Sequence, residues 1–355
     1  MLRRRALSLV ALLAVAAALA GARAPEAAPA RTLDLYFLDS EGGAATLIVT
    51  PAGESLLFDS GNRTDDNRDA NRIVKAIKDA KLSRLDHYVT SHWHADHFGG
   101  IGAVAEKVNI RNYWDRGIPE TLPEDPRNFP ALMGIYQRIS KGKSSPLRPG
   151  DTIPLKAIKN GPSLQLLCVV SDRQAINVEG ALGNAACSQH EAKPADTSDN
   201  ARSVGLKLTY GDFDYACLGD LTWNVEHDLA CPVNRVGEID LFQVTHHGLP
   251  SSNNPVLVKA LNPRVAIFEN GITKGCDPAV VRTLRELSDL QAVYQIHRKL
   301  NSSPADQAPL AHIANLNGQG EADAGGYIKA SVAPDGSSYA ITVTSQGRPR
   351  EFKSR

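Results

Sequence analysis

The sequence predicts a single mixed α/β domain. Short hydrophobic runs bounded by turn residues alternate with stretches whose hydrophobic residues recur at helical spacing. The composition is that of an ordinary globular protein, with 42% hydrophobic and 22% charged residues. No internal repeat and no shift of composition divides residues 33–345, so we expect this range to form one domain.

The expected elements follow one another along the chain. We expect strands over residues 33–38, 45–50, 55–59, 84–91, 204–211, 214–220 and 240–245, and a helix over 70–82. Residues 255–268 and 278–296 have the pattern of two helix–strand units, and 326–345 that of a closing hairpin. The polar segments 115–150 and 172–202 are expected to shape a pocket, and the last ten residues, 346–355, to form a frayed basic tail.

The N-terminus has the pattern of a secretory signal. Three arginines precede an Ala-rich hydrophobic run that is short for a membrane span, and small residues follow it. We therefore predict a cleaved signal peptide over residues 1–24, a linker over 25–32, and export to the periplasm or beyond. Removing four arginines lowers the basic count from 39 to 35 against 39 acidic residues. The mature chain would then be slightly acidic, without a membrane span and without the basic patch that long nucleic acids require.

Five cysteines are too few and too scattered for a disulfide scaffold or a zinc finger. An exported chain allows one or two disulfides with one thiol left over, and the sequence does not fix the pairing. Cys168 and Cys217 lie in hydrophobic runs typical of strands, where buried free thiols are expected.

The stretch SHWHADHFGG, residues 91–100, concentrates metal-binding side chains. In an extended chain His92 and His94 point the same way and can share one ion, while Asp96 and His97 can reach a second. Imidazole together with carboxylate suits zinc, with manganese or iron as alternatives. Such a site needs further ligands, and Asp220 and the pair His246–His247 follow hydrophobic runs where strands are expected to end.

These motifs, in this order, resemble the metallo-β-lactamase superfamily. The resemblance is greater to one branch, the metallo-hydrolase domain of ComEC-type competence proteins. The segments that carry it are FLDSEGGA at 37–44, LLFDSG at 56–61, TSHWHADHFGG at 90–100, NARSVGLKL at 200–208, LGD at 218–220 and THHGLPSS at 245–252. The resemblance implies a four-layer αβ/βα sandwich with two divalent metal ions at the edge of its sheets.

The resemblance also implies a role for each candidate residue. His92 and His94 would bind the first metal, and Asp96 and His97 the second. Asp220 would bridge the two ions. Asp59 would orient a ligand from behind. Because neighbours in a strand point to opposite faces, we expect only one of His246 and His247 to complete the second site and the other to contact substrate or donate a proton.

The chain also departs from the family pattern. The additional histidine usual before the bridging aspartate has no clear counterpart here. Either His190, Asn200 or Ser203 completes the first site, or the first metal keeps an open position. The opening segment reads Ser-Glu-Gly-Gly-Ala, and Leu249 rather than serine follows HHG. These departures bear on metal affinity and substrate fit rather than on the fold.

The resemblance implies a metal-dependent hydrolase of phosphodiester bonds that uses a metal-bridging hydroxide, with Asp96, His246 and His247 as catalytic candidates. The acidic balance of the mature chain favours small or short substrates. The alternatives are ring opening of a β-lactam or lactone, and a degenerate, metal-stabilised binding module. The sequence predicts no oligomeric state.

Overall fold

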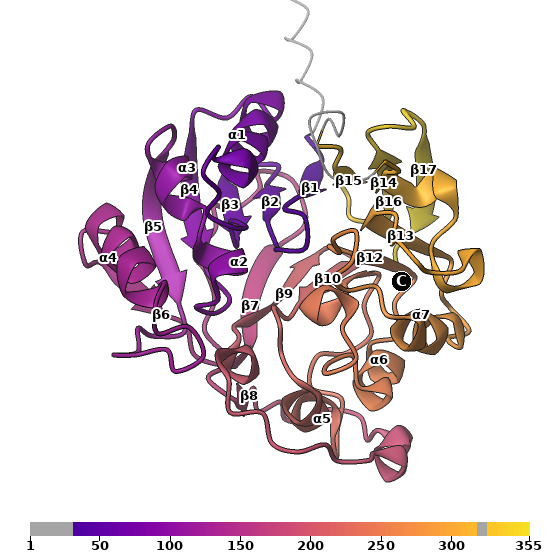
Figure 1. Ribbon diagram of the computed structural model, residues 1–355. Coiled ribbons are helices and arrows are strands. Elements are labelled where there is room, and N and C mark those ends of the chain that lie inside the picture. The colour runs from indigo at the N-terminus through magenta and orange to yellow at the C-terminus, as the bar shows by residue number, and fades with distance from the viewer. Residues whose placement is uncertain (1–30, 318–324) are drawn as a thin grey trace, which may run out of the picture. The chain divides into compact units, whose positions relative to one another are not determined.

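Two β-sheets lie face to face at the centre of a computed structural model of the chain (Figure 1). The structure describes residues 31–317 and 325–355, and Arg31–Arg355 forms one compact unit. The predicted signal peptide, residues 1–24, and all but the last two residues of the predicted linker lie outside the described residues.

Within the described residues the first sheet has nine strands. In spatial order they are β17 (Pro349–Lys353), β16 (Ser338–Val343), β15 (Ile328–Val332), β1 (Leu33–Phe37), β2 (Thr46–Val49), β3 (Ser55–Phe58), β4 (Arg84–Val89), β5 (Asn109–Asp115) and β6 (Ser144–Pro146). Neighbours from β17 to β3 pair antiparallel, and neighbours from β3 to β6 pair parallel. The sheet thus joins an antiparallel half to a parallel half.

The second sheet has eight strands over the same described part of the chain. In spatial order they are β14 (Ile313–Asn315), β13 (Ala292–His297), β12 (Val265–Phe268), β11 (Leu241–Gln243), β10 (Phe213–Cys217), β9 (Gly205–Tyr210), β7 (Leu164–Ser171) and β8 (Gln174–Ala175). Strands β10 to β14 pair parallel, and β9, β7 and β8 extend the sheet in the antiparallel sense.

Helices cover the outer face of each sheet. The α-helices are α1 (Arg68–Asp79), α2 (Ala95–Phe98), α3 (Ile101–Ala105), α4 (Phe129–Ile139), α5 (Trp223–Ala230), α6 (Pro255–Leu261) and α7 (Pro278–Arg285). The 3₁₀ helices are Ala185–Gln189, Asp199–Arg202, Thr245–Gly248, Pro304–Asp306 and Leu310–His312. None of the helices in the described residues has the length and hydrophobicity that crossing a bilayer requires.

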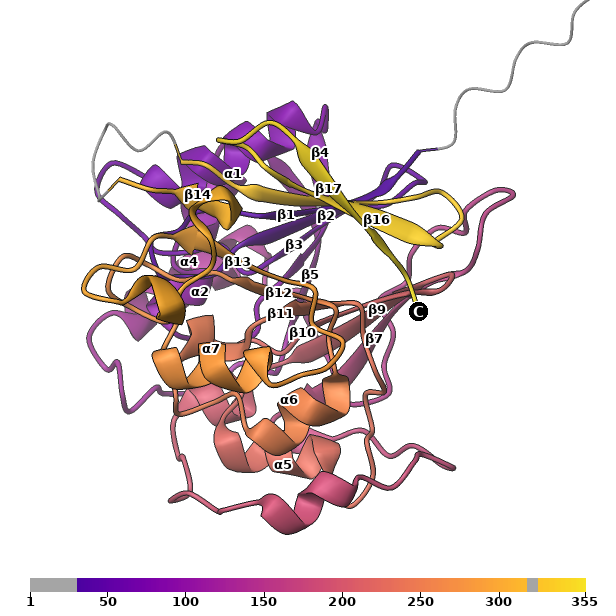
Figure 2. The same ribbon diagram turned by 90° about the vertical axis from the view of Figure 1, so that its right-hand side faces the viewer.

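Three hydrophobic cores separate four layers. The central core lies between the sheets and combines side chains of both, such as Phe37 and Val89 of the first with Tyr215 and Ile267 of the second. A second core joins helices α1–α4 to the first sheet, and a third joins helices α5–α7 to the second. Figure 2 shows the sheets between these two groups of helices. The predicted four-layer αβ/βα sandwich is confirmed.

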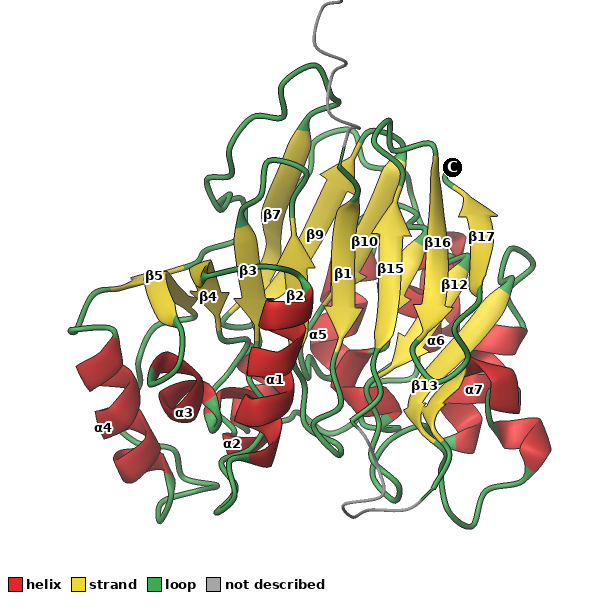
Figure 3. Cartoon of the chain, turned by 90° about the horizontal axis from the view of Figure 1, so that it is seen from above, coloured by secondary structure: helices red, strands yellow, loops and turns green. Residues whose placement is uncertain are grey.

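Most predicted elements are confirmed, but the C-terminal tail is a correction. Residues 346–355 do not form a frayed tail, because β17 pairs with β16 and extends the first sheet (Figure 3). Phe352 is buried against Tyr339, with ring centroids 5.3 Å apart. The basic residues that suggested a tail lie on an edge strand, where charged side chains oppose pairing with a strand of another molecule. Arg355 also forms ion pairs with Glu238 and Asp289 at 3.1 Å.

Candidate metal centre

The predicted site residues follow the carboxyl ends of strands from both sheets. Asp59 follows β3, the segment 91–97 follows β4, Asp220 follows β10, and the 3₁₀ helix Thr245–Gly248 follows β11. Parallel strands end at the same edge of a sheet, and ligands of open α/β sheets bind at that edge. Direct hydrogen bonds join the segments: the N–H of Val204 donates to the carbonyl oxygen of Ser91, and the N–H of His246 to that of Gly219.

Four of the predicted ligands form a close group. Asp96, His97, Asp220 and His247 each offer one ligand atom, and these atoms lie within 4.8 Å of one another. Asp220 Oδ2 is 3.2 Å from His97 Nε2 and 3.4 Å from His247 Nε2. Asp96 Oδ2 is 3.6 Å from each of the same two nitrogens. This is the set predicted for the second metal together with the bridging aspartate.

The two ligands predicted for the first metal lie next to this group. The ring of His92 is centred 4.1 Å from that of His97 and 4.6 Å from that of His94. His92 is fully buried, whereas His94 is partly exposed. His246 is also near, because its Nε2 is 3.3 Å from Asp220 Oδ2. We call the seven residues His92, His94, Asp96, His97, Asp220, His246 and His247 the His/Asp cluster.

The buried histidines of the cluster are held through Nδ1, which leaves Nε2 directed inward. Nδ1 of His97 donates to Asp59 Oδ2 at 2.8 Å, and Nδ1 of His247 donates to the carbonyl oxygen of Glu269 at 3.0 Å. Nδ1 of His92 is 2.9 Å from the Ser91 hydroxyl, which itself donates to Asp59. Such partners fix the ring orientation of metal-binding histidines.

Three of these Nε2 atoms test whether the site suits a metal. Nε2 of His92, His97 and His247 is buried, and within the described residues none of the three makes a hydrogen bond of good geometry. A buried nitrogen that makes no hydrogen bond is costly and rare in native proteins, and two of the three, on His97 and His247, have the Asp220 carboxylate within 3.4 Å as an ion-pair partner. Imidazole nitrogens together with the carboxylates of Asp96 and Asp220 form a donor set for zinc, iron or manganese. The residues therefore fit divalent metal ions.

Protonation in the cluster is compatible with metal binding. Burial lowers the pKa of His92 well below its ordinary value and that of His246 to about 4. Burial alone would raise the pKa of Asp220, but His246, His97 and His247 hold it well below its usual range. For His97 the balance is reversed: burial lowers its pKa, but Asp220, Asp96 and Asp59 raise it well above 6.5. Metal binding needs a neutral imidazole, so it would be coupled to loss of any proton that His97 carries.

Asp59 lies at a constrained backbone position behind the cluster. Its φ of 60° is in the left-handed region, which is uncommon for a residue with a side chain. Asp59 Oδ1 accepts the N–H of Ser91, and Oδ2 accepts the Ser91 hydroxyl, both at 2.7 Å. With His97 as the third donor, the carboxylate contacts two segments of the motif, as expected of a residue that orients a ligand.

The backbone of His246 and His247 corrects the expectation that their side chains point to opposite faces of a strand. His246 and His247 lie beyond β11 rather than within a strand, and both have left-handed backbones, with φ of 54° and 55°. Their side chains therefore do not point to opposite faces, and both Nε2 atoms approach Asp220. His247 belongs to the group of four, and His246 lies on the side of Asn200, whose Nδ2 is 3.5 Å from His246 Nε2.

His190 lies apart from the close group of four. Its ring stacks on that of His227 at 4.0 Å, and its Nδ1 is 3.1 Å from Asn254 Nδ2. The other two alternatives reach the cluster: Asn200 contacts His246, and the Ser203 hydroxyl accepts the backbone N–H of Asp220 at 3.1 Å. Two of the alternatives predicted for the first site, Asn200 and Ser203, therefore lie next to the cluster.

Two charged residues beside the cluster were missed by sequence reasoning. Glu124 Oε1 is 3.3 Å from His94 Nε2, and Lys274 forms an ion pair with Asp96 Oδ2. Glu124 comes from the segment 115–150 that was expected to shape a pocket. Lys274 lies six residues beyond the end of β12, and it could have been suspected because β12 is parallel to β11 and ends at the same edge.

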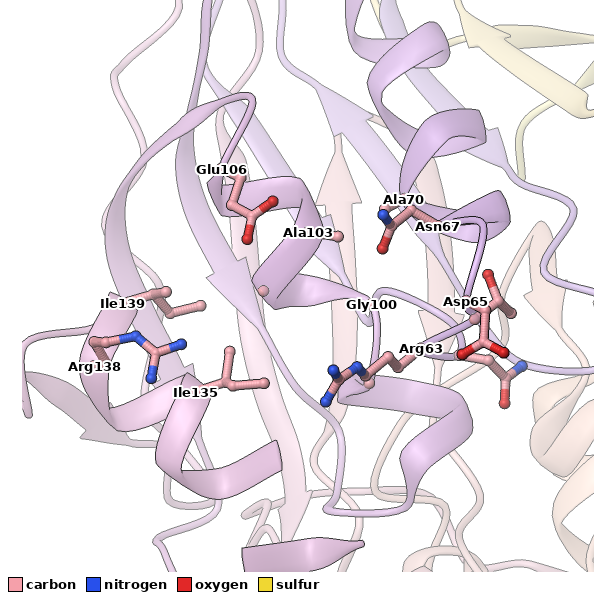
Figure 4. Close-up of a pocket in the computed structure, with 14 residues that line it drawn as sticks. Arg63, Asp65, Asn67, Ala70, Gly100, Ala103, Glu106, Ile135, Arg138 and Ile139 are labelled. Atoms are coloured by element: carbon pink, nitrogen blue, oxygen red, sulfur yellow. The ribbon is translucent and has the colours of Figure 1, made fainter. Parts of the chain in front are cut away.

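A cavity of about 390 Å³ lies behind the motif rather than at the cluster. It is lined by the loop 62–67, by Gly99 and Gly100, and by parts of α3 and α4 (Figure 4). Arg63 and Arg138 border it together with the acidic residues Asp65 and Glu106. This mixture of charges indicates no particular ligand.

The arrangement defines a class: an α/β sandwich with a His/Asp cluster suited to divalent metals at one edge of its sheets. Residues 39–164 match the family model described as the metallo-β-lactamase superfamily. Over these residues the chain is therefore similar to the metallo-β-lactamase superfamily. No curated protein matches the chain with significant similarity.

Solved structures similar to this chain include proteins of different activities. CmlA, a diiron β-hydroxylase from Streptomyces venezuelae, is 14% identical with a TM-score of 0.47, and the match covers 77% of this chain and 54% of CmlA. The metallo-β-lactamase fold protein YhfI from Bacillus subtilis is 11% identical, with a TM-score of 0.42 and coverage of 74% and 95%. A metallo-β-lactamase from Cronobacter sakazakii is 13% identical, with a TM-score of 0.32 and coverage of 59% and 73%. This chain thus spans about half the length of CmlA, and likeness at these levels says nothing of its activity.

Proposed function

We propose that this protein is a hydrolase of phosphodiester bonds that uses two divalent metal ions, zinc in the first instance. The observation that carries the proposal is the position of Asp220. Its Oδ2 lies within 3.4 Å of Nε2 of His97, His246 and His247. A carboxylate so placed is suited to bridge two ions, and the Gly-Asp and His-His-Gly motifs resemble the ComEC-type branch.

Two divalent ions bound here would polarise a phosphoryl oxygen and lower the pKa of a water molecule. The residues of the chain would do the rest. Asp59 and Ser91 fix the rings of His97 and His92, so the ligands are positioned before substrate arrives. His246, whose pKa is lowered by burial, would face the substrate as a neutral imidazole near the leaving group.

A small or short substrate suits the charge of the chain. The full sequence has no net charge, and removing the predicted signal would leave it slightly acidic. Long nucleic acids bind mainly through many phosphate contacts with basic side chains. We therefore propose a small phosphodiester or the end of a short oligonucleotide as substrate.

We also propose that the protein works outside the cytosol. The support is the disulfide Cys187–Cys231, a bond that persists mainly in oxidising compartments. N-terminal sequencing of the protein recovered from a periplasmic fraction tests this proposal. A start near residue 25 is expected, whereas an intact Met1 in the cytosolic fraction would contradict it.

The experiment that tests the function combines metal content with turnover. Purified protein is loaded with zinc, its metal is counted by plasma mass spectrometry, and hydrolysis of bis-(p-nitrophenyl) phosphate and of nitrocefin is followed. His94→Ala removes a proposed ligand. His227→Ala is the matched control, because His227 lies outside the cluster, where its Nδ1 contacts the adjacent Asp228 carboxylate and its ring stacks on that of His190.

Two ions per chain, together with diester hydrolysis that is lost in His94→Ala and retained in His227→Ala, would support the proposal. A fully loaded protein without diester hydrolysis would overturn it. Nitrocefin hydrolysis would then indicate a β-lactamase, and a single tightly held ion without any turnover would indicate a metal-stabilised binding module.

A further inference from the structure

Lys274 places a positive charge directly beside the His/Asp cluster. Its ammonium forms an ion pair with Asp96 Oδ2, the same oxygen that lies 3.6 Å from Nε2 of His97 and of His247. Among the described residues, Lys274 is the only lysine or arginine that forms an ion pair with a member of the cluster. The side chain of Lys274 is 37% exposed, so it also reaches solvent.

The loop that carries Lys274 is held against a ligand of the cluster. The N–H of Cys276 donates to the carbonyl oxygen of His247 at 2.8 Å, and the N–H of Gly271 donates to that of Lys274 at 3.0 Å. Lys299 Nζ donates to the carbonyl oxygen of Gly275 at 2.7 Å. The Cα of Lys274 is therefore fixed relative to His247, and only its side chain is free to reorient.

An ammonium group has three donors, and Asp96 can accept only part of them. A divalent ion that binds the Asp96 carboxylate competes with Lys274 for the same oxygen. The Lys274 ammonium would then stay at the rim of the centre with donors available to another anion. Glu124 contacts His94, so a carboxylate and the Lys274 ammonium border different members of the cluster.

We propose that Lys274 binds an anionic oxygen of the substrate next to the second metal position, and so makes the site selective for phosphate-bearing substrates. This proposal deepens the proposed function, because it names the group that recognises the phosphate. Lys274 acts outside the metal coordination shell. The ammonium donates a charge-assisted hydrogen bond to a phosphoryl oxygen, an interaction about twice as strong as a neutral hydrogen bond.

Binding of inorganic phosphate tests the proposal without any need for turnover. Zinc-loaded wild-type protein is titrated with inorganic phosphate in a calorimeter, and its metal content is measured in parallel. Lys274→Met removes the charge and keeps the length of the side chain, while Lys274→Arg keeps the charge. Lys75→Met is the matched control, because Lys75 forms an exposed i,i+4 ion pair with Asp79 on α1.

We expect Lys274→Met to raise the Kd of phosphate about tenfold at unchanged metal content, and Lys274→Arg and Lys75→Met to stay near the wild-type Kd. An unchanged Kd in Lys274→Met would overturn the proposal. Loss of metal in Lys274→Met would also overturn it, since Lys274 would then act on the metal ligand Asp96. Weakened phosphate binding in a protein without diester hydrolysis would keep this proposal and reject the proposed function.

Discussion

The Asp59 carboxylate and the His97 imidazole form a fully buried pair, with 2.8 Å between Oδ2 and Nδ1. The same carboxylate accepts the backbone N–H and the hydroxyl of Ser91, and the Ser91 hydroxyl lies 2.9 Å from His92 Nδ1. One side chain therefore orients a ligand in each of the two proposed metal positions. Its effect on metal binding is open to a direct test.

Asp59→Asn should weaken metal binding by about 10- to 100-fold, because an amide cannot accept all three hydrogen bonds and its NH₂ opposes the Nδ1–H of His97. Competition with a chromophoric chelator measures the affinity. Asp66→Asn, at an exposed position before α1, is the control and should leave the affinity unchanged. An unchanged affinity in Asp59→Asn would show that Asp59 supports only the fold.

The two adjacent histidines should differ in metal stoichiometry. His247 belongs to the group that includes Asp96, His97 and Asp220, so His247→Ala should lower the metal content from two ions to one. His246→Ala should leave that group intact and keep both ions. Mass spectrometry under native conditions counts the ions in each variant. Equal losses in both variants would contradict the assignment of His247 to the second site.

Gly275 allows the Lys274 loop to approach His247. Its φ is +78°, and a Cβ placed on it would lie 2.2 Å from the carbonyl oxygen of His247. Gly275→Ala should therefore displace His247, lower the melting temperature and reduce metal content. Gly180→Ala is the matched control, because Gly180 has a φ of +71° but nothing within 4 Å of the added atom. If both variants lose the same stability, backbone strain rather than the contact is responsible.

Glu226 gives a prediction for pH. It is buried, its Oε2 accepts the N–H of Asn254 at 2.7 Å, and burial raises its pKa from 4.5 to about 7. Between these values the folded state binds more protons than the unfolded state, so this residue makes the free energy of unfolding fall as pH rises from about 4.5 to about 7. The full cost of ionisation is on the order of 3 kcal/mol.

Glu226→Gln keeps an oxygen acceptor and removes the ionisation. Relative to wild type it should therefore be more stable at pH 8 than at pH 5, as measured by urea denaturation in the presence of a chelator. Chelation removes the pH dependence of metal binding from the comparison. A difference in stability that does not change with pH would contradict a raised pKa at Glu226.

The disulfide Cys187–Cys231 closes a loop with a sequence separation of 44 residues. Replacing both cysteines by serine should lower the free energy of unfolding by about 2–4 kcal/mol. Cys168, Cys217 and Cys276 are buried free thiols, so a mild reductant should act on this bond alone. Reductant should therefore destabilise the wild type and leave the double variant unchanged. A stable, reductant-insensitive wild type would contradict the bond.

The fold could be predicted because most of it obeys local rules. The strands and helices that the periodicity indicated recur with nearly the same bounds, and the hairpin β15–β16 turns at Gly336, whose φ is +78°. The edge strand β17 was missed because its residues are exposed apart from Phe352, so no alternation of hydrophobic residues marks it. Its pairing with β16 is a tertiary contact that composition does not reveal.

The candidate site could be predicted where one motif places its own side chains. His92, His94, Asp96 and His97 are close in sequence and therefore close in space. The left-handed backbone of His246 and His247 has no signature in a sequence without glycine at those positions, which is why the strand rule failed there. Glu124 and Lys274 reach the cluster only because long-range packing brings their loops to it.

The close group of four draws two residues, Asp96 and His97, from beyond a strand of the first sheet and two, Asp220 and His247, from beyond strands of the second. An ion held by this group would therefore link the two sheets at the edge where these strands end. The supply of metal would then affect the stability of the fold as well as its activity. Without metal this link between the two sheets would be missing, which would make the adjoining loops easier for proteases to cut.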